Sequence, residues 1–448
     1  MEDDESLSNR IADEIESLKL TVGNLCTLAI QSASGSTILS YEPFAEFWRK
    51  FYLDNQQTQQ AGAFYGLCQV TGQRAPISDS VKSRIKGLVS IGCRADAYLV
   101  TGLGSADSYN LTGARAAMVS EAEVDSFTRA ANALIANAFD GKQTSYRVGG
   151  VMFLFWTRQD SEAGVFNLFE PIPESVAGLL SSVLKGKDSM IENGNDDFYL
   201  LVLSGNSARV VVRDYFAAPL RRVRQSLAAW FSDLRIADCS KGQQGQPTSL
   251  FPLWMLSVQT AFDGDGVAPD TPSRLTLAAI EGHPIPESIL LACLRRLRAE
   301  GASGFRAARM ALVKLVLIRQ GVPMSEMLDP DERHPAYLYG RLLCMFEQIQ
   351  YAALGDVNAN VVDKFYSVFS AAPAQVFNRL FSNAQNHLRK LRTERPGSFV
   401  SLDKRLTELV ALLPASPPAG QLSVRDQGRF ALGYYNQRAK QFEEIATH

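Results

Sequence analysis

The residue types that most often carry out catalysis or bind metals are scattered along this sequence. None of its four histidines belongs to the H-E-x-x-H pattern that puts two zinc ligands on one helix face; they are His283, His334, His387 and His448. Asp263-Gly-Asp265-Gly266 begins like a calcium-binding loop, but Val267 and Ala268 stand where a further oxygen ligand and the turn glycine are required. We interpret that segment as a solvated turn.

Patterns for phosphate binding and nuclease chemistry are also weak. Gly102-Leu-Gly104 lacks the third glycine of a dinucleotide-binding fingerprint, and the sequence contains no G-x-x-x-x-G-K-[ST]. Asp196-Asp197 precedes a strand-like run and could imitate the carboxylate pair of a nuclease, although turn chemistry explains it with fewer assumptions. We predict that the chain is not an enzyme and uses no cofactor and no metal. A nuclease without recognisable metal-ligand spacing is the alternative.

Cysteine usage and hydropathy indicate the compartment. The six cysteines are widely spaced and form no C-x-x-C pair, which argues against a zinc site and against a secreted disulfide framework. No run of about 18 uninterrupted apolar residues occurs, and the N-terminal residues lack a basic-then-apolar signal pattern. The sequence therefore predicts a soluble cytoplasmic protein without a membrane segment.

Basic residues gather in clusters, although the formal net charge of the chain is only −2. Between Arg209 and Arg319 there are fifteen Lys and Arg residues against nine Asp and Glu residues. Most are arginines, whose planar guanidinium binds phosphate with two hydrogen bonds. The clusters are Arg221, Arg222 and Arg224; Arg295, Arg296 and Arg298; and Arg306, Arg309, Lys314 and Arg319. Each cluster could follow a phosphate backbone, and a set of solvated helix faces is the alternative.

Two further basic segments lie outside that region. Residues 374–395 are predicted to form a helix that carries Arg379, Arg389, Lys390, Arg392 and Arg395. Lys82, Arg84 and Lys86 lie in a stretch that also contains Gly and Ser, where the backbone can approach a duplex closely. Together with the clusters at 221–224 and 295–298, these residues are our candidates for nucleic-acid binding.

The elements that must position these residues predict an α+β protein. Short β-rich runs occur at 66–71, 97–101 and 148–157, and a helix is expected at 120–139 with Ser120 and Glu123 in capping-box spacing. The strand-like runs 198–203 and 208–213 flank Ser204-Gly-Asn-Ser207 and predict a hairpin, followed by a helix at 220–234. Mixed α/β structure is therefore expected in the N-terminal and central region.

After a Gly/Gln-rich linker at 241–247, the periodicity is helical. Helices are predicted at 250–262, 286–300, 304–320, 336–354, 360–370, 374–392, 399–413 and 423–446, with Pro373 in a first-turn position. The short loops of the last third favour antiparallel neighbours in a C-terminal helical bundle. Four parts follow: a helical, aromatic-rich segment at 1–60, a mixed α/β domain at 61–240, a helical connecting region at 248–322 and the bundle at 324–448.

Several segments also occur in an order that resembles one protein family. Downstream they are His334-Pro-Ala-Tyr-Leu-Tyr-Gly-Arg-Leu-Leu343, residues 353–359, Asn378-Arg-Leu-Phe381 with 387–390, and Phe430-Ala-Leu-Gly-Tyr-Tyr-Asn-Gln-Arg438. Upstream they are residues 68–77, Ile85-Lys-Gly87 and the hairpin-plus-helix segment 197–234. Over residues 60–448 the sequence thus resembles the large subunit of the type I-C CRISPR Cascade, an RNA-guided DNA surveillance complex.

The resemblance implies a non-catalytic, DNA-facing subunit in antiviral defence. It would bind target double-stranded DNA near the short flanking motif, stabilise the displaced strand of the R-loop and help to recruit a helicase-nuclease. The CRISPR RNA would read the target sequence. The implied protein partners are the guide-RNA backbone subunits and the subunit that binds the 5′ handle. The family bundle resembles the small Cascade subunit, which can arise from an internal start, here expected at Met324 or Met327.

One feature departs from the family pattern. Members usually carry a longer N-terminal domain before the segment at 68–77, where this sequence has about sixty residues. The chain is therefore a compact variant, or its start is truncated, or motif recognition lies elsewhere in the molecule. That domain contributes much of the flanking-motif recognition in the family. The alternative function is therefore an assembly scaffold of such a complex that does not sense the motif.

Overall fold

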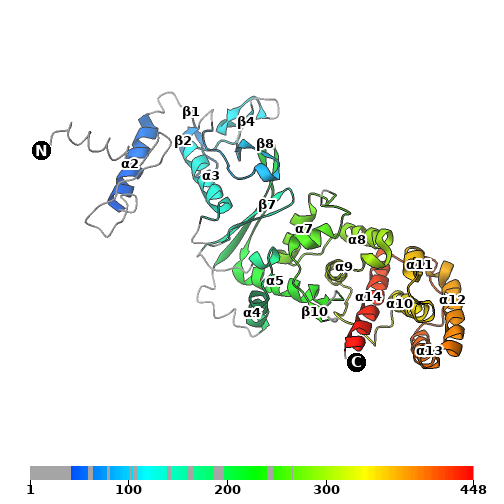
Figure 1. Ribbon diagram of the computed structural model, residues 1–448. Coiled ribbons are helices and arrows are strands. Elements are labelled where there is room, and N and C mark those ends of the chain that lie inside the picture. The colour runs from blue at the N-terminus through cyan, green and yellow to red at the C-terminus, as the bar shows by residue number, and fades with distance from the viewer. Residues whose placement is uncertain are drawn as a thin grey trace, which may run out of the picture. The chain divides into compact units, whose positions relative to one another are not determined.

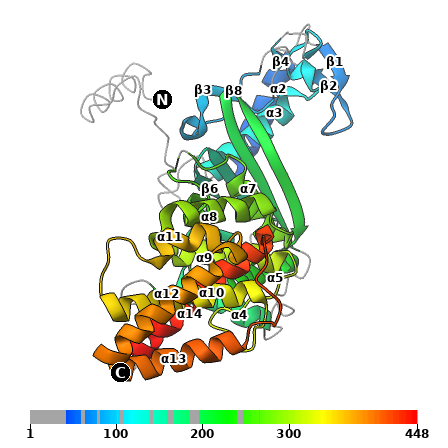
Figure 2. The ribbon, with the colours of Figure 1, turned by 90° about the vertical axis from the view of Figure 1, so that its right-hand side faces the viewer.

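The computed structural model (Figures 1 and 2) describes residues 42–58, 64–77, 81–100, 102–103, 108–138, 143–158, 165–184, 196–239, 246–264 and 266–446. Two compact units are present: Met1–Val81 with Val100–Val124, and Lys82–Leu99 with Asp125–His448. Both strands and helices occur, with the helices dominating after residue 250, so the expected α+β class is confirmed. Most of the predicted 1–60 segment and of the linker at 241–247 lies outside the described residues.

In the described part of the first unit there are a helix and two small antiparallel ribbons. These are α2 (Glu42–Thr58), β1 (Phe64–Leu67) paired with β2 (Arg74–Ile77), and β4 (Gly102–Leu103) paired with β5 (Thr112–Gly113). The 3-10 turn η4 (Ala114–Ala116) follows β5. The strand predicted at 66–71 ends at Leu67, because Gly72 takes a positive φ of 70° and Cys68 N–H donates to the carbonyl of Gln73, which turns the chain.

The second unit is built on a four-stranded sheet in the order β3-β8-β7-β6. Its strands are β3 (Cys93–Tyr98), which follows η2 (Val89–Ile91), and β6 (Ser145–Val148), β7 (Val151–Thr157) and β8 (Asp197–Pro219). β7 is antiparallel to β6 and to β8, with register from Val151 opposite Ser204 to Thr157 opposite Phe198. The helix α3 (Glu121–Ile135) begins as predicted, with Glu123 N–H donating to Ser120 Oγ at 3.4 Å.

β8 turns back on itself, as the hairpin prediction requires. Leu220 N–H, just after its end, donates to the carbonyl of Asp196, just before its start, at 2.9 Å. Arg213 Nε also donates to Ser204 Oγ at 2.6 Å across the two legs. Ser207, with a positive φ of 53°, lies near the tip, so the turn falls at the end of the predicted Ser204–Ser207 stretch.

The sheet buries a different core on each face. Alternate residues of β7 and β8, such as Phe153, Phe155 and Leu200, join the main core, whereas Met152, Leu154 and Leu203 join a smaller one beneath η2 and α3. Strand side chains point alternately to opposite faces. Covering both faces therefore requires the near-continuous apolar run that the sequence has at 151–156.

The helices complete the main core. Beside the sheet these are η5 (Val165–Leu168), α4 (Pro173–Leu184) and α5 (Leu220–Leu234), followed by the short ribbon of β9 (Ile236–Ala237) and β10 (Pro247–Thr248). Then come α6 (Leu253–Val258), α7 (Thr271–Glu281), α8 (Glu287–Glu300), η7 (Gly301–Gly304), α9 (Ala307–Arg319), α10 (Pro335–Leu354), α11 (Val361–Phe369), α12 (Pro373–Glu394), α13 (Pro396–Ala411) and α14 (Val424–Ala446). One connected cluster of buried side chains extends from Phe153 of β7 to Tyr435 of α14, so the boundaries predicted near residues 240 and 323 fall within one compact unit.

Two motifs that carried the family resemblance meet where α10 and α14 cross. A Cβ on Gly340 would lie 2.0 Å from the carbonyl oxygen of Phe430, and a Cβ on Gly433 would lie 2.1 Å from that of Tyr337. Arg341 Nε donates to Gln437 Oε1 at 3.0 Å across the same contact. Glycine at both positions lets the two backbones touch, so these motifs act in packing.

Candidate nucleic-acid interface

The basic helix α12 is buried along one side only. Pro373 lies in its first turn, as predicted, and its buried residues Leu380, Ala384, Leu388 and Leu391 recur at helical spacing. They face the core that α12 shares with α10, α11 and α13. The predicted cations Arg379, Arg389, Lys390 and Arg392, and also Arg395, are all exposed. The apolar stripe therefore fixes the helix while the cations face solvent.

Contacts of the α12 cations leave their charges accessible. The Arg379 guanidinium lies over the ring of Phe365 in α11, 5.3 Å from its centroid, and that of Arg392 lies over Phe399 in α13 at 5.9 Å. Lys390 Nζ is 3.8 Å from a carboxylate oxygen of Glu394, and both side chains are about half exposed. Stacking on a ring orients a guanidinium without neutralising it, and an exposed ion pair is weak. This face can accordingly bind phosphate groups.

The loop with Lys82, Arg84 and Lys86 is fixed by hydrogen bonds to α3. Ser83 Oγ donates to Asp125 at 2.6 Å, and the amide of Asn132 accepts from Lys86 N–H at 2.8 Å and donates to the carbonyl of Arg84 at 3.0 Å. All three basic side chains are exposed. The loop therefore displays its cations from an anchored backbone.

The cluster at the start of α5 is split by the turn of the helix. Arg221 and Arg222 are exposed, whereas Arg224 is half-buried beside the core side that carries Val223 and Leu227. Successive helical positions are about 100° apart, so three neighbouring arginines cannot all point away from a core. Arg221 and Arg222 remain the members available to a phosphate.

The cluster at the end of α8 is split more sharply. Arg295 is exposed, but Arg296 is only 8% exposed, forms an ion pair with Glu300 and stacks on Phe262 at 4.9 Å. Arg298 is half-buried and donates to the side chain of Gln427 in α14. The Arg296 guanidinium is thus occupied inside the protein, and Arg295 is the exposed member of this cluster.

The third cluster, on α9, is largely internal. Arg309 is fully buried and donates to both oxygens of Glu300, at 3.0 and 3.2 Å. Lys314 is 2% exposed and donates to the carbonyl of Asp233 at 2.6 Å, while Arg319 is 3.0 Å from the Asp233 carboxylate. Burial lowers the pKa of Lys314 to about 8, with Asp233 opposing the shift. The phosphate-binding interpretation of this cluster is wrong for Arg309 and Lys314, because both are sealed in the core.

Other exposed cations were missed by the sequence reasoning. Arg209 and Arg213 lie on the second leg of β8, and Lys364 lies on α11. The even spacing of Arg209 and Arg213 within a predicted strand was a usable signal, since it puts both on one face. Lys364 has no cationic neighbour in sequence, so only the fold brings it near Arg379.

Metal-ligand groups and membrane-spanning helices do not occur among the described residues. No group of three or more His, Cys, Asp or Glu side chains among them could hold a metal ion. No helix among them combines the length and apolar character needed to cross a membrane.

The chain matches the model of a known protein family. The model of a family described as CRISPR-associated protein (Cas_Csd1) matches residues 5–442. The motif resemblance began near residue 60, so the family match extends it over most of the N-terminal segment. In the comparison with curated proteins, no sequence matches the chain.

Proposed function

Because the chain belongs to the Csd1 family of CRISPR-associated proteins, we propose that it is the large, non-catalytic subunit of a type I-C RNA-guided complex. In this role it binds target DNA near the flanking motif, stabilises the displaced strand and helps to recruit the helicase-nuclease. It acts in the cytoplasm beside the CRISPR RNA, the guide-RNA backbone subunits and the subunit that binds the 5′ handle.

The observation that carries this proposal is the exposed basic face of α12. Its cations extend over four turns of one helix and are all exposed, on the surface that the buried apolar stripe leaves uncovered. A row of cations on a rigid helix follows a phosphate backbone without reading bases, and such binding weakens steeply with salt. This suits a displaced single strand of any sequence, since the guide RNA supplies the specificity.

The chain alone should bind nucleic acid weakly. Its formal net charge of −2 provides no long-range attraction for a polyanion, so only the local clusters contribute. In the assembled complex the guide-RNA subunits hold the target close to these clusters. Tight, sequence-specific duplex binding by the purified chain at about 0.15 M salt would contradict this proposal.

A charge-matched pair of triple variants tests the α12 face. We expect Arg389→Gln, Lys390→Gln and Arg392→Gln together to weaken single-stranded DNA binding for all sequences. The log–log slope against salt should fall by about 2, at roughly 0.7 per lost phosphate contact. The control removes the same charge elsewhere, through Arg274→Gln, Lys404→Gln and Arg425→Gln, all in exposed ion pairs. Fluorescence anisotropy across a salt series, with free chain and assembled complex, gives both slopes.

Equal slopes for the two triple variants would refute the phosphate role of α12. Co-purification with the guide-RNA subunits then tests whether the chain still acts as an assembly scaffold. If the α12 variant assembles normally and its DNA binding is unchanged, the result supports the alternative function, an assembly scaffold.

A further inference from the structure

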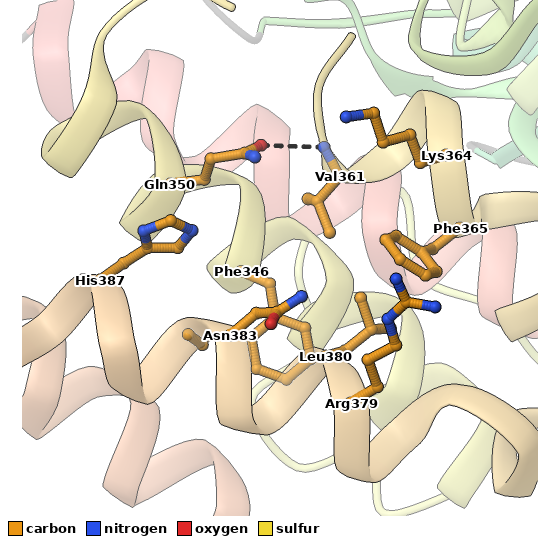
Figure 3. Close-up of a pocket in the computed structure, with 10 residues that line it drawn as sticks. Phe346, Gln350, Val361, Lys364, Phe365, Arg379, Leu380, Asn383 and His387 are labelled. Atoms are coloured by element: carbon orange, nitrogen blue, oxygen red, sulfur yellow. Dashed lines mark hydrogen bonds between the residues drawn. The ribbon is translucent and has the colours of Figure 1, made fainter.

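A pocket opens between α10, α11 and α12, on the same part of the molecule as the basic face of α12 (Figure 3). Its volume is about 190 Å³, below the roughly 300–1,000 Å³ of sites that enclose drug-sized ligands. The pocket therefore has room for one planar ring, with a small anion at its opening. α10 contributes Phe346 and Gln350, α11 contributes Lys364 and Phe365, and α12 contributes Arg379 and Asn383.

The charge of the pocket favours an anion. Lys364 and Arg379 line it, and no carboxylate is among its ten lining residues. Arg379 makes a stacking contact with Phe365, and Lys364 forms no ion pair within the described residues. Figure 3 shows these three side chains together at one end of the pocket. Two unneutralised cations beside one opening are suited to a phosphate group.

The opposite end supplies polar groups around an apolar wall. Gln350 Oε1 accepts from Val361 N–H at 2.9 Å, which orients this amide, and His387 lies near it (Figure 3). The side chain of Asn383 has no hydrogen-bond partner within the described residues. Burial, with help from Lys390, lowers the pKa of His387, so the neutral ring can both donate and accept at neutral pH. Amides and a neutral imidazole match the mixed donors and acceptors on the edge of a nucleobase.

Phe365 provides the stacking surface. Its ring is half-buried, so it is held by the core yet partly open, and Arg379 already lies 5.3 Å from its centroid. Phe346 forms the buried floor of the pocket. An aromatic ring beside cations is the arrangement by which proteins hold unpaired bases of single strands without strict sequence preference.

We propose that this pocket holds one unstacked nucleotide of a single-stranded nucleic acid. The base lies against Phe365 with its edge toward Asn383 and Gln350, and the adjoining phosphate lies between Lys364 and Arg379. This inference rests on the proposed DNA-binding function and adds to it a site for a base. The pocket fixes the position of the strand along α12, while the other cations bind phosphates only.

Abasic DNA separates this site from ordinary phosphate binding. The full chain is titrated at low salt with a single-stranded oligonucleotide and with the same oligonucleotide lacking all bases. We expect Phe365→Leu, which keeps most of the packing volume, to weaken binding of the normal strand by about fivefold or more and to leave the abasic strand unchanged. The matched control is Phe399→Leu, which removes the ring beneath Arg392 outside the pocket and should affect neither strand selectively.

A crosslinking measurement on the unchanged protein guards against a folding defect in the variant. An oligonucleotide that carries 5-iodouracil is irradiated with the full chain, and the crosslinked peptide is identified by mass spectrometry. We expect it to contain Phe365 or Phe346. Crosslinks found only in other peptides, or equal losses of single-strand binding with Phe365→Leu and Phe399→Leu, would overturn the proposal for the pocket. Salt-dependent binding in the same experiments would still support the proposed function. Absence of any salt-dependent binding by the unchanged chain would overturn both.

Discussion

α9 and α12 carry the same kinds of cation at helical spacing, yet they use them in opposite ways. Residues 308–317 of α9 are buried without interruption, because α5, α8, α14 and β9 all contact this helix. α12 buries a single stripe and leaves its cations exposed to solvent. The number of covered faces, more than the spacing of the cations, decides whether an arginine binds a partner inside the protein or outside it.

The internal cations of α9 depend on matched anions. Arg309 and Arg296 share Glu300, whose pKa is lowered by its hydrogen bonds to Arg309 and Arg296 in spite of burial. A buried charge whose partner is removed becomes very costly, whereas an exposed one is hydrated by water. The two helices should consequently respond very differently to the same substitution.

The largest expected effect comes from removing α9 altogether. A fragment of about 324–448 keeps α10–α14, and its independent folding stays a prediction. The structure shows which contacts it loses: Gly428 of α14 packs against Leu290 and Leu317, and Tyr435 Oη donates to the carbonyl of Ala237 at 2.6 Å. We expect a helical fragment whose Tm is about 10 °C or more below that of the full chain, measured by circular dichroism. An equal Tm would show that α8 and α9 do not stabilise the bundle.

That fragment also tests function. It retains the basic face of α12 and the pocket, so it should join the assembled complex along the path of the displaced strand. Co-purification with the guide-RNA subunits measures this. A folded fragment that never enters the complex would show that the bundle acts only as part of the full chain.

The next largest effect is expected from Arg309→Met. It removes two hydrogen bonds to Glu300 and one to the carbonyl of Gly304, leaving Glu300 with Arg296 as its remaining partner. We expect a loss of about 3 kcal/mol in the free energy of unfolding, measured by urea denaturation. Arg389→Met on α12 is the matched control and should change stability by less than about 0.5 kcal/mol. Similar losses for both variants would remove the distinction between the helices.

Arg295 and Arg296 allow the comparison within one cluster. Arg296→Gln should cost about 1–2 kcal/mol of stability, because it weakens the pairing with Glu300, and should leave the salt slope of DNA binding unchanged. Arg295→Gln should do the reverse, with unchanged stability and a slope lower by about 0.7 if it contacts a single strand. A fall in the salt slope for Arg296→Gln would contradict the burial argument.

Lys314 gives the smallest and most specific signal. Its pKa in the folded chain is about 8, below its ordinary value of 10.5. Between these two values the unfolded chain binds more protons, so the free energy of unfolding must rise with pH in that window. Relative to Lys314→Met, the unchanged protein should gain about 1 kcal/mol of stability from pH 8 to pH 9, measured by denaturation at each pH. A constant difference would mean that Lys314 is hydrated in the folded state.

Local sequence signals predicted the helices with a clear start or an apolar stripe. Pro373 and the apolar stripe predicted the bounds of α12 to within two residues, and Ser120 predicted the start of α3. The sequence did not predict α7. Eight of its residues are buried, among them Thr271, Ser273 and Thr276, so the helix has no continuous solvent-facing polar side. The amphipathic pattern exists only where a helix has one face in water.

By itself the sequence determined the α+β class, the helical C-terminal half and the motifs of the family. These follow from short-range patterns, because propensity and periodicity act within about one helical turn to the next. Only the tertiary structure decided which cations are accessible and where the pocket lies. Arg309 and Arg389 look alike in sequence, and Lys364, Arg379 and Asn383 come from separate turns of two helices. Burial and convergence depend on contacts between distant segments, and no local pattern records which segments will cover a given side chain.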